Sequence, residues 1–213
     1  MGIPVLVLGE SGSGKSASLR NFEAEDVSIF NVAAKPLPFR KKLPMKATSD
    51  YNVIVNGISK SQKKAFVIDD SQYLMCFESF ARVKETGYGK YTDFALHFYN
   101  LVQFIIKHTP PDVIVYFLHH TETDSNTGKT KAKTMGKMLD NQLTLEGLFS
   151  IVLICTTDGK THSFITQSDG FTTAKSPMEM FPEVIDNDLK EDDQTIREYY
   201  ELNEKENEND QET

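Results

Sequence analysis

The sequence predicts an α/β protein in which a mostly parallel β-sheet is flanked by helices. Three observations lead to this prediction. Short apolar segments alternate with segments of helical spacing, a pattern typical of parallel sheets whose strands are connected by helices. The first apolar segment, 3–8, runs directly into a glycine-rich turn. The chain has 213 residues, 39% hydrophobic and 25% charged, which suits one globular domain with a core of its own.

In the N-terminal half, short apolar runs rich in β-branched residues predict strands, and apolar residues that recur every three or four positions predict helices. The helix expected after the glycine-rich turn would direct Leu19 and Phe22 towards the sheet. In chain order we expect strand 3–8, helix 14–22, strand 27–32, an irregular basic segment 33–45 that contains prolines, a strand at 51–55 and strand 65–68.

The C-terminal half continues the alternation. Phe94, Phe98 and Leu101 recur at near-helical spacing and predict a long helix. The dipeptide at 158–159, Asp-Gly, predicts a turn that folds the chain back as a hairpin. The expected elements are helices 73–83 and 91–107, strand 113–118, a polar mobile loop 121–134, and a C-terminal β-hairpin of strand 151–155 with its partner 162–166.

The net charge of −8 is concentrated at one end of the chain. Residues 183–213 contain 13 acidic and three basic residues, whereas residues 1–182 carry a small positive net charge. We therefore expect a folded domain over 1–182 and an acidic tail, largely disordered, over 183–213. The tail could occupy a basic surface in place of DNA, keep the chain in solution, or dock a partner.

Two further features limit the class of protein. There is no run of about 18 apolar residues and no signal-peptide pattern, so we expect neither a membrane span nor secretion. Cys76 and Cys155 lie in apolar surroundings, which predicts buried thiols rather than a disulfide framework. Together these features favour a reducing, cytoplasmic location.

Residues 9–17 carry the most specific signal in the chain. The phosphate-binding P-loop motif G-x-x-x-x-G-K-[ST] is matched in full, and Ala17 follows it. In such a loop, glycines let backbone N–H groups surround phosphate oxygens, and the lysine, Lys15, reaches the β- and γ-phosphates. The hydroxyl of Ser16 would hold Mg²⁺. The motif therefore predicts that ATP, or a similar nucleoside triphosphate, binds with Mg²⁺ at Gly9, Glu10, Ser11, Gly12, Ser13, Gly14, Lys15, Ser16 and Ala17.

The apolar strand that ends at Asp69-Asp70 is typical of a Walker B strand. The carboxylate of Asp69 would emerge at the ligand edge of the sheet and hold the magnesium shell through water. Asp70 has two interpretations. It could orient or deprotonate the attacking water, or it could cap the helix that follows.

The next strand ends in the pair His119-His120. A polar side chain at this position can sense the γ-phosphate in P-loop ATPases, and we assign this catalytic role to His120. The alternative is that the two histidines have only a structural role, with their ring nitrogens hydrogen-bonded within the fold. A metal site is disfavoured, because no further His, Cys or carboxylate stands at ligand spacing.

The loop after this strand is rich in lysine, and a flexible basic loop beside a nucleotide can follow a phosphate backbone. An ordinary solvated loop is the alternative, and no aromatic residue is interleaved to support base stacking. Further along the chain, Lys175 is a candidate cation for the γ-phosphate of a neighbouring subunit. The nucleic-acid candidates are Lys129, Lys131, Lys133 and Lys137.

The order of these parts resembles that of the short RecA-like ATPases encoded by bacteriophages, the Sak4-type family of single-strand recombination proteins. The resemblance covers roughly residues 3–182. It rests on the N-terminal P-loop, the strand ending at Asp69, the strand ending at His119-His120, and three later segments, 135–137, 166–170 and 174–176 before Phe181-Pro182.

The resemblance implies a RecA-like core over 1–182, ATP hydrolysis stimulated by single-stranded DNA, and head-to-tail homo-oligomers, as rings or filaments, with ATP between subunits. By the same resemblance the loop 123–135 would face DNA and Lys175 would act in trans. It also implies a bacterial host cell and suggests a single-strand-binding protein as a further partner. One feature departs from the family pattern. The strand expected to end in a catalytic glutamate runs into Asn31-Val32-Ala33, so either Asp70 replaces this base or hydrolysis is slow.

Two other functions fit the motifs. A small-molecule P-loop kinase would share the phosphate-binding loop, but such kinases usually carry an arginine-rich lid, and segment 121–134 contains no arginine. A non-catalytic module that assembles when it binds nucleotide would explain the missing glutamate.

Overall fold

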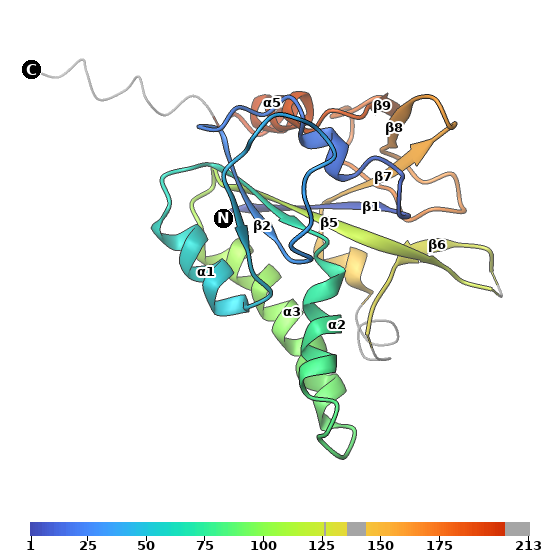
Figure 1. Cartoon of the computed structure of the whole chain (residues 1–213). Helices are drawn as coiled ribbons and strands as arrows, with labels where there is room; N and C mark the ends of the chain where they lie inside the picture. Colours follow the sequence, from blue (N-terminus) through green and yellow to red (C-terminus); the bar gives the residue numbers. More distant parts are fainter. Residues whose placement is uncertain (126, 136–143, 203–213) are drawn as a thin grey trace, which may run out of the picture.

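The chain forms three layers, with a central β-sheet between two layers of helices (Figure 1). The structure, a computed structural model, describes residues 1–125, 127–135 and 144–202. Within these ranges the sheet has nine strands, in the order β3-β2-β4-β5-β1-β7-β8-β9 with β6 paired to β5. The strands are β1 (Ile3–Gly9), β2 (Val27–Asn31), β3 (Met45–Ala47), β4 (Ala65–Asp69), β5 (Ile114–Thr123), β6 (Thr130–Ala132), β7 (Ile151–Thr157), β8 (His162–Ile165) and β9 (Val184–Asp186).

The helices divide between the two faces of this sheet. One face is covered by α1 (Tyr51–Lys60), α2 (Gln72–Ala81) and α3 (Gly89–His108), and the other by the short 3-10 helix η1 (Ser16–Leu19) and α5 (Leu189–Tyr199) (Figure 1). A second 3-10 helix, η2 (Leu145–Leu148), precedes β7. The end of α2 and the start of α3 project away from the sheet as a helical hairpin.

The predicted fold class is confirmed at the level of an α/β protein with a mostly parallel sheet flanked by helices. All pairings from β3 across to β7 are parallel, and β8 and β9 add to the β7 edge in antiparallel fashion. The predicted hairpin around 158–159 is therefore also confirmed.

The central strand explains why the apolar runs are continuous rather than alternating. In β1, Leu6 and Leu8 pack into the core beneath the long helices, whereas Val5 and Val7 pack into the core beneath η1 and α5. All four side chains are fully buried. A strand covered on both faces needs apolar residues at every position, as parallel sheets require.

The prediction of a strand at 51–55 is wrong, because this segment begins helix α1. Asp50 caps the helix by accepting hydrogen bonds from the N–H groups of Asn52 and Val53, at 2.8 and 3.4 Å. Ile54 and Ile58 lie four residues apart and are buried on the face towards the sheet. The cap and this spacing outweigh the β-propensity of a short apolar run.

The helix predicted over 14–22 is reduced to η1, a single 3-10 turn. The hydroxyl of Ser18 donates to the Lys15 carbonyl at 2.6 Å, and such local bonds from serine compete with helical ones. Leu19 and Phe22 nevertheless pack against the sheet as expected, and both are fully buried.

The predicted mobile loop 121–134 is instead the β5–β6 hairpin. Thr121, Glu122 and Thr123 pair with Ala132, Lys131 and Thr130, and the Glu122 and Lys131 side chains form a cross-strand ion pair at 3.2 Å. Gly128 turns the chain with a φ of 67°, a value that glycine adopts without strain. Alternating threonines and one opposite-charge pair were the sequence signals of this hairpin.

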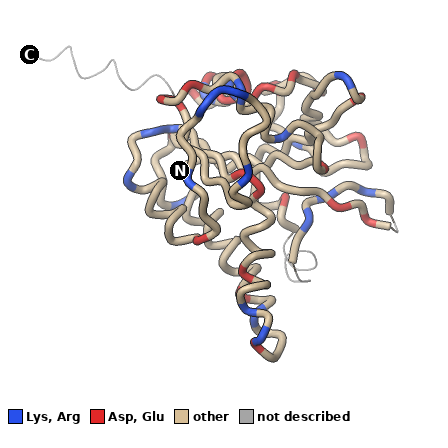
Figure 2. Tube along the Cα trace, in the orientation of Figure 1, with Lys and Arg blue, Asp and Glu red and all other residues tan. Residues whose placement is uncertain are grey.

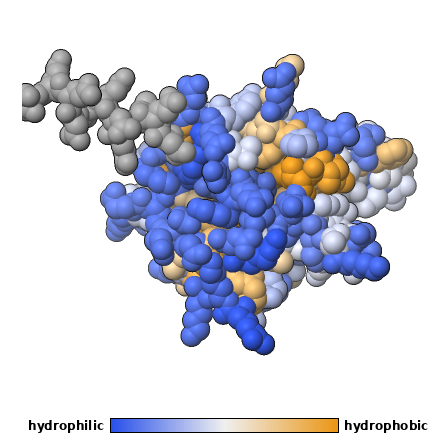
Figure 3. Space-filling model, turned by 90° about the horizontal axis from the view of Figure 1, so that it is seen from above, coloured by the Kyte–Doolittle hydropathy of each residue, from blue (hydrophilic) through white to orange (hydrophobic). Residues whose placement is uncertain are grey.

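The expectation of a largely disordered acidic tail is wrong for residues 184–199, which form β9 and α5. Leu189 and Ile196 of α5 are fully buried, and Asp193 accepts a hydrogen bond from the buried Tyr116 hydroxyl at 2.9 Å. Of the acidic residues of α5, Glu191 and Glu198 are exposed, whereas Asp192 and Asp193 are buried. Figure 3, which views this layer from above, shows a mostly hydrophilic face with a smaller hydrophobic area. Residues 203–213 of the predicted tail lie outside the described residues. The boundary of the folded domain is therefore not at Pro182.

Asp192 of α5 leads to a prediction about stability. One of its carboxyl oxygens is buried with no hydrogen-bond partner in the described part of the chain. Burial, together with Asp188, Glu191, Asp186 and Asp193, raises its pKa from 3.8 to about 8. The contribution of this group to stability is therefore fully present below about pH 4 and is lost as the pH rises through 8.

Replacing Asp192 with asparagine should stabilise the fold at pH 7 by about 1–3 kcal/mol and much less at pH 4. Urea unfolding at the two pH values measures this difference. Glu25→Gln, at an exposed position, is the control and should show no such pH dependence. Equal stabilisation by Asp192→Asn at both pH values would contradict the assignment.

Candidate functional site

Polar residues from four parallel strands meet at one edge of the sheet. Gly9 at the end of β1 pairs with His120 of β5, and Asn31 at the end of β2 pairs with Asp69 of β4. The carboxyl ends of these strands border a cleft of about 330 Å³, the location at which α/β sheets bind ligands. Its lining includes Gly14, Lys15, Ser16, Lys35, Asp69, Asp70, His120 and His162.

The glycine-rich loop 9–16 has the form of an anion-binding cradle. Gly12 and Gly14 adopt φ values of 83° and 106°, which L side chains rarely reach. In the described part of the chain, the backbone N–H groups of Gly12, Gly14 and Lys15 donate to no protein acceptor. These three residues line one cleft, and unpaired N–H groups there fit the oxygens of a phosphate.

Two side chains from the β7–β8 hairpin fix the orientation of this loop. The Cys155 thiol and the His162 Nδ1 both donate to the Ser13 carbonyl, at 3.0 and 2.7 Å. A trans peptide points its N–H away from its carbonyl, so these bonds turn the Gly14 N–H away from the hairpin. A Cβ on Gly14 would stand 2.7 Å from the His162 ring, so only glycine fits this position.

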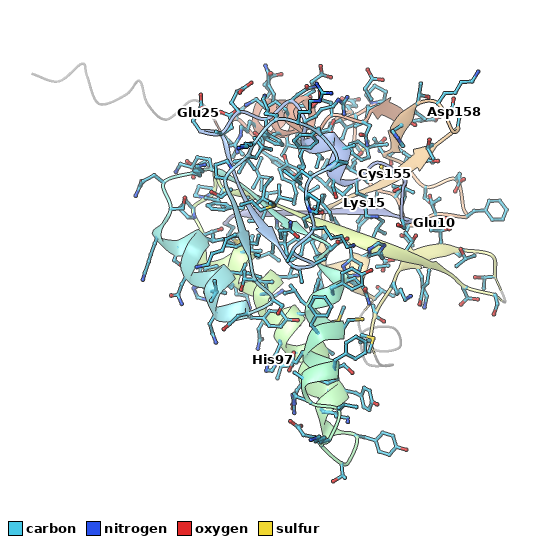
Figure 4. The ribbon with its side chains drawn as sticks, in the orientation of Figure 1. Glu10, Lys15, Glu25, His97, Cys155 and Asp158 are labelled. Carbon is cyan, nitrogen blue, oxygen red and sulfur yellow. The ribbon has the colours of Figure 1, made fainter. Side chains whose placement is uncertain are left out.

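Burial makes Cys155 a structural thiol. It is 3% exposed, and burial raises its pKa to about 11, so it remains protonated and acts as a donor. Figure 4 shows Cys155 in the same region as Lys15 and Glu10 of the loop. The prediction of a buried thiol is confirmed for Cys155, and both cysteines are free.

Lys15 lies inside the loop rather than in solvent. It is 6% exposed, and its ammonium donates to the carbonyls of Gly9 and Glu10 at 2.7 and 2.9 Å. Burial lowers its pKa, although Cys155, Asp70 and Asp69 oppose this effect. The loop thus presents one desolvated cation beside free N–H groups, which favours a multiply charged anion as ligand.

Ser16 and Asp69, the predicted metal residues, are in direct contact. The Ser16 hydroxyl donates to Asp69 Oδ1 at 2.9 Å, and burial raises the pKa of Asp69 despite this bond. The described residues contain no group of three or more His, Cys, Asp or Glu side chains that could enclose a metal. A hydroxyl beside one carboxylate fits Mg²⁺ in particular, because this ion takes few protein ligands and completes its shell with phosphate and water.

Asp70 faces the cleft and does not cap helix α2. Its carboxylate accepts bonds from Lys35 Nζ at 2.9 Å and from His120 Nε2 at 3.1 Å. Burial alone would raise its pKa, but the bonds from His120 and Lys35 hold the pKa below its ordinary value. The backbone of Asp70 has a φ of 59°, a strained value for a non-glycine residue that is often found at functional sites.

The two histidines differ in their surroundings. His119 is fully buried, and its Nε2 donates to the Lys133 carbonyl at 2.8 Å while its Nδ1 accepts from the Ser71 hydroxyl at 2.9 Å. Burial lowers the pKa of His119 to about 3, so this ring is neutral and structural. His120 instead borders the cleft and contacts Asp70. Of the pair, only His120 is placed to meet a ligand there.

Lys35 is a candidate site residue that sequence reasoning missed. It lies in the segment expected to be irregular, and the hydrogen bond to Asp70 raises its pKa. Asn31 holds this segment in place, since its side chain bonds both the N–H and the carbonyl of Lys35. Thus the end of β2, which carries no acidic residue, instead carries an amide that orients a cation. The only sequence signal was the basic, proline-rich composition of 33–45.

The predicted nucleic-acid residues that the structure describes do not line this cleft. Lys129 and Lys131 belong to the β5–β6 hairpin, and Lys133 follows β6 (Figure 2). Lys137 lies outside the described residues. Lys175 forms an isolated bridge with Val152 of β7 and borders a second cleft, together with Lys129 and Lys131. The structure therefore does not bring Lys175 to the glycine-rich loop of its own subunit.

A larger cavity, of about 560 Å³, lies among the three helices that cover one face of the sheet. It is bordered by Tyr51, Phe77 and His97, which come from α1, α2 and α3. It shares no lining residue with the cleft beside loop 9–16. Its size alone does not make it the candidate site, because the convergent polar groups lie in the smaller cleft.

Comparisons with known proteins do not indicate a function, so the functional assignment rests on the geometry of the site. No protein-family model matches the chain, and no curated protein matches it significantly. Among the described residues, no helix has both the length and the apolar character needed to cross a membrane.

Proposed function

We propose that this chain is a P-loop ATPase that binds ATP with Mg²⁺ and acts on single-stranded DNA. One observation carries the nucleotide part: Lys15, the Ser16–Asp69 pair and the free N–H groups of loop 9–16 share one cleft. This combination of a cradle, a cation and a hydroxyl–carboxylate pair is complementary to a triphosphate with its metal ion.

Each residue has a role that follows from its contacts. The N–H groups of Gly12, Gly14 and Lys15 would bind phosphate oxygens, and the Lys15 ammonium would leave the Gly9 and Glu10 carbonyls for the β- and γ-phosphates. Ser16 and Asp69 would hold Mg²⁺, which supplies charge neutralisation at the phosphates.

Asp70 and His120 are the candidates for positioning water at the γ-phosphate. Their contact of 3.1 Å leaves His120 at the cleft and gives Asp70 a fixed orientation. Lys35, bound to the same carboxylate, would add positive charge near the γ-phosphate. The two bonds on Asp70 also favour a second candidate, a nucleotide-dependent assembly module with slow turnover, because a carboxylate of lowered pKa is a weak base.

The DNA part of the proposal rests on the basic hairpin and on the family resemblance. Lys129, Lys131 and Lys133 lie on or beside the β5–β6 hairpin, which extends from the strand that carries His120. A head-to-tail homo-oligomer with ATP between subunits belongs to the same proposal.

The test is phosphate release from Mg²⁺–ATP with and without single-stranded DNA, with a magnesium chelator as the blank. We expect hydrolysis that the chelator abolishes and that DNA stimulates several-fold. Tight ATP binding with slow turnover that DNA leaves unchanged would favour the assembly module instead. Phosphate transfer that requires a small acceptor would replace both with a kinase.

A further inference from the structure

An exposed aromatic side chain lies next to the basic hairpin. Phe171, in the segment between β8 and β9, is 66% exposed. Its carbonyl accepts a hydrogen bond from the Thr130 N–H of β6 at 2.8 Å, so segment 168–175 lies against the hairpin. A ring left this open to water has no role in the core, and its place beside the basic hairpin is what makes it a candidate for ligand contact.

The backbone that carries Phe171 is held firmly. Asp169 Oδ1 accepts from the N–H groups of Phe171 and Thr172 at 2.8 and 3.0 Å, and the Ser168 hydroxyl donates to the Thr172 carbonyl at 2.7 Å. Gly170 supplies the turn with a φ of 92°. The ring is therefore presented from a defined turn, which lowers the entropic cost of binding a partner.

Cations gather beside this ring. A cleft of about 430 Å³ between the hairpin and segment 168–175 is bordered by Lys129, Lys131 and Lys175. Lys131 pairs with Glu122, but the Lys129 and Lys175 ammonium groups have no carboxylate partner in the part of the chain that the structure describes. Two cations without such partners favour an anionic ligand.

The carboxylates beside the cleft accept hydrogen bonds from neighbouring groups, and Asp124, which lines the cleft, accepts from the Thr127 N–H at 3.0 Å. Glu146 is buried and accepts from the Ala132 N–H at 2.7 Å and from the Thr173 hydroxyl at 3.2 Å, and Asp169 accepts the two N–H groups described above. In the wall of the same cleft, Thr172 is buried, at 9% exposure, beside Asp169. The cleft thus has two cations without carboxylate partners, and its wall includes Ser168 and Thr172 of the segment that carries the exposed Phe171 ring.

We propose that this cleft binds single-stranded DNA, with Phe171 stacking on a base and with Lys129 and Lys175 contacting phosphates. This inference rests on the DNA part of the proposed function and makes it specific. Single-stranded nucleic acid offers base faces and phosphates together, whereas a duplex hides its base faces in the stack. Lys175 is thereby assigned to DNA within its own subunit rather than to the ATP of a neighbour.

The sequence could not reveal this arrangement. Phe171 lies more than thirty positions after Lys133, the last of the described lysines that were predicted to contact DNA. The two segments meet only because β8 returns the chain along the β7 edge, which places 168–175 beside β6.

The experiment measures binding of a fluorescent oligo-dT to the full chain as a function of salt. Phe171→Ala should weaken binding by about 5- to 150-fold, the range expected for the loss of one stacked base, with an unchanged salt slope and unchanged ATP hydrolysis in the absence of DNA. Phe171→Tyr should restore most of the affinity. Phe80→Ala is the matched control, because Phe80 of α2 is 68% exposed, and it should bind as the wild type does.

The lysines should behave differently from the ring. Lys129→Gln and Lys175→Gln should each flatten the dependence of log K on log salt by about 0.7. If the wild type binds oligo-dT and Phe171→Ala binds equally well, the stacking site is overturned while the proposed function stands. If the wild type does not bind oligo-dT at all, the DNA part of the proposed function fails together with this site.

Discussion

Replacing Lys15 with alanine is expected to lower kcat/KM for ATP hydrolysis by at least about 10²–10³-fold, the loss that follows removal of one electrostatic stabiliser of the transition state. The Lys15 ammonium is the cation built into the glycine-rich loop, and its only hydrogen bonds in the described structure go to two carbonyls of the same loop. The folded chain should survive the change, because a buried ammonium is also costly to desolvate. Phosphate release at saturating Mg²⁺–ATP measures the effect.

The control for this variant is Lys60→Ala, at an exposed lysine in the last turn of α1. It should hydrolyse ATP at the wild-type rate. Circular dichroism should show the same helix content for both variants. Hydrolysis by a folded Lys15→Ala variant at the wild-type rate would mean that the cleft at 9–16 is not the site of the reaction.

Ending the chain at Asp188, before α5, is expected to lower the melting temperature by at least about 10 °C or to leave the chain insoluble. The deletion removes Leu189 and Ile196 from the core, each fully buried and worth about 1.5–3 kcal/mol. It also leaves the buried Tyr116 hydroxyl without its Asp193 partner. Losses of this size are a large part of the roughly 5–15 kcal/mol that stabilises a typical domain.

A chain that ends at Leu202 is the matched control, since it keeps every described contact of α5. It should melt close to the full chain. A chain ending at Asp188 that melts at the same temperature as the full chain would show that α5 contributes little to the fold. Any test of whether the acidic end competes with DNA should therefore use the end at Leu202 and leave α5 in place.

The features that could be predicted from the sequence are those set by local chemistry. The central strands β1, β4 and β7 are largely continuous apolar runs, as burial on both faces requires, and loop 9–16 carries its glycines and Lys15 at fixed spacing. Because the carboxyl ends of parallel strands share one edge, the sequence also predicted that Asp69 and His120 lie near that loop, and the structure brings them to one cleft.

The features that could not be predicted depend on contacts between distant segments. Cys155 and His162 hold the Ser13 carbonyl from the β7–β8 hairpin, and Lys35 reaches Asp70 from a proline-rich segment. Helix α5 looked like part of a disordered tail, because its few apolar residues are outnumbered by acids and only its packing on the sheet reveals its stability. No local pattern encodes such contacts.

Strand β5 has a consequence for how the two proposed ligands would influence each other. It passes the glycine-rich loop at His120 and continues without a break into the β5–β6 hairpin, and the N–H of Lys133 bonds the His120 carbonyl at 2.9 Å. A ligand that fixes His120 therefore also restrains both strands of the hairpin. Any resulting coupling free energy is reciprocal. The factor by which bound ATP raises the affinity for DNA equals the factor by which bound DNA raises the affinity for ATP.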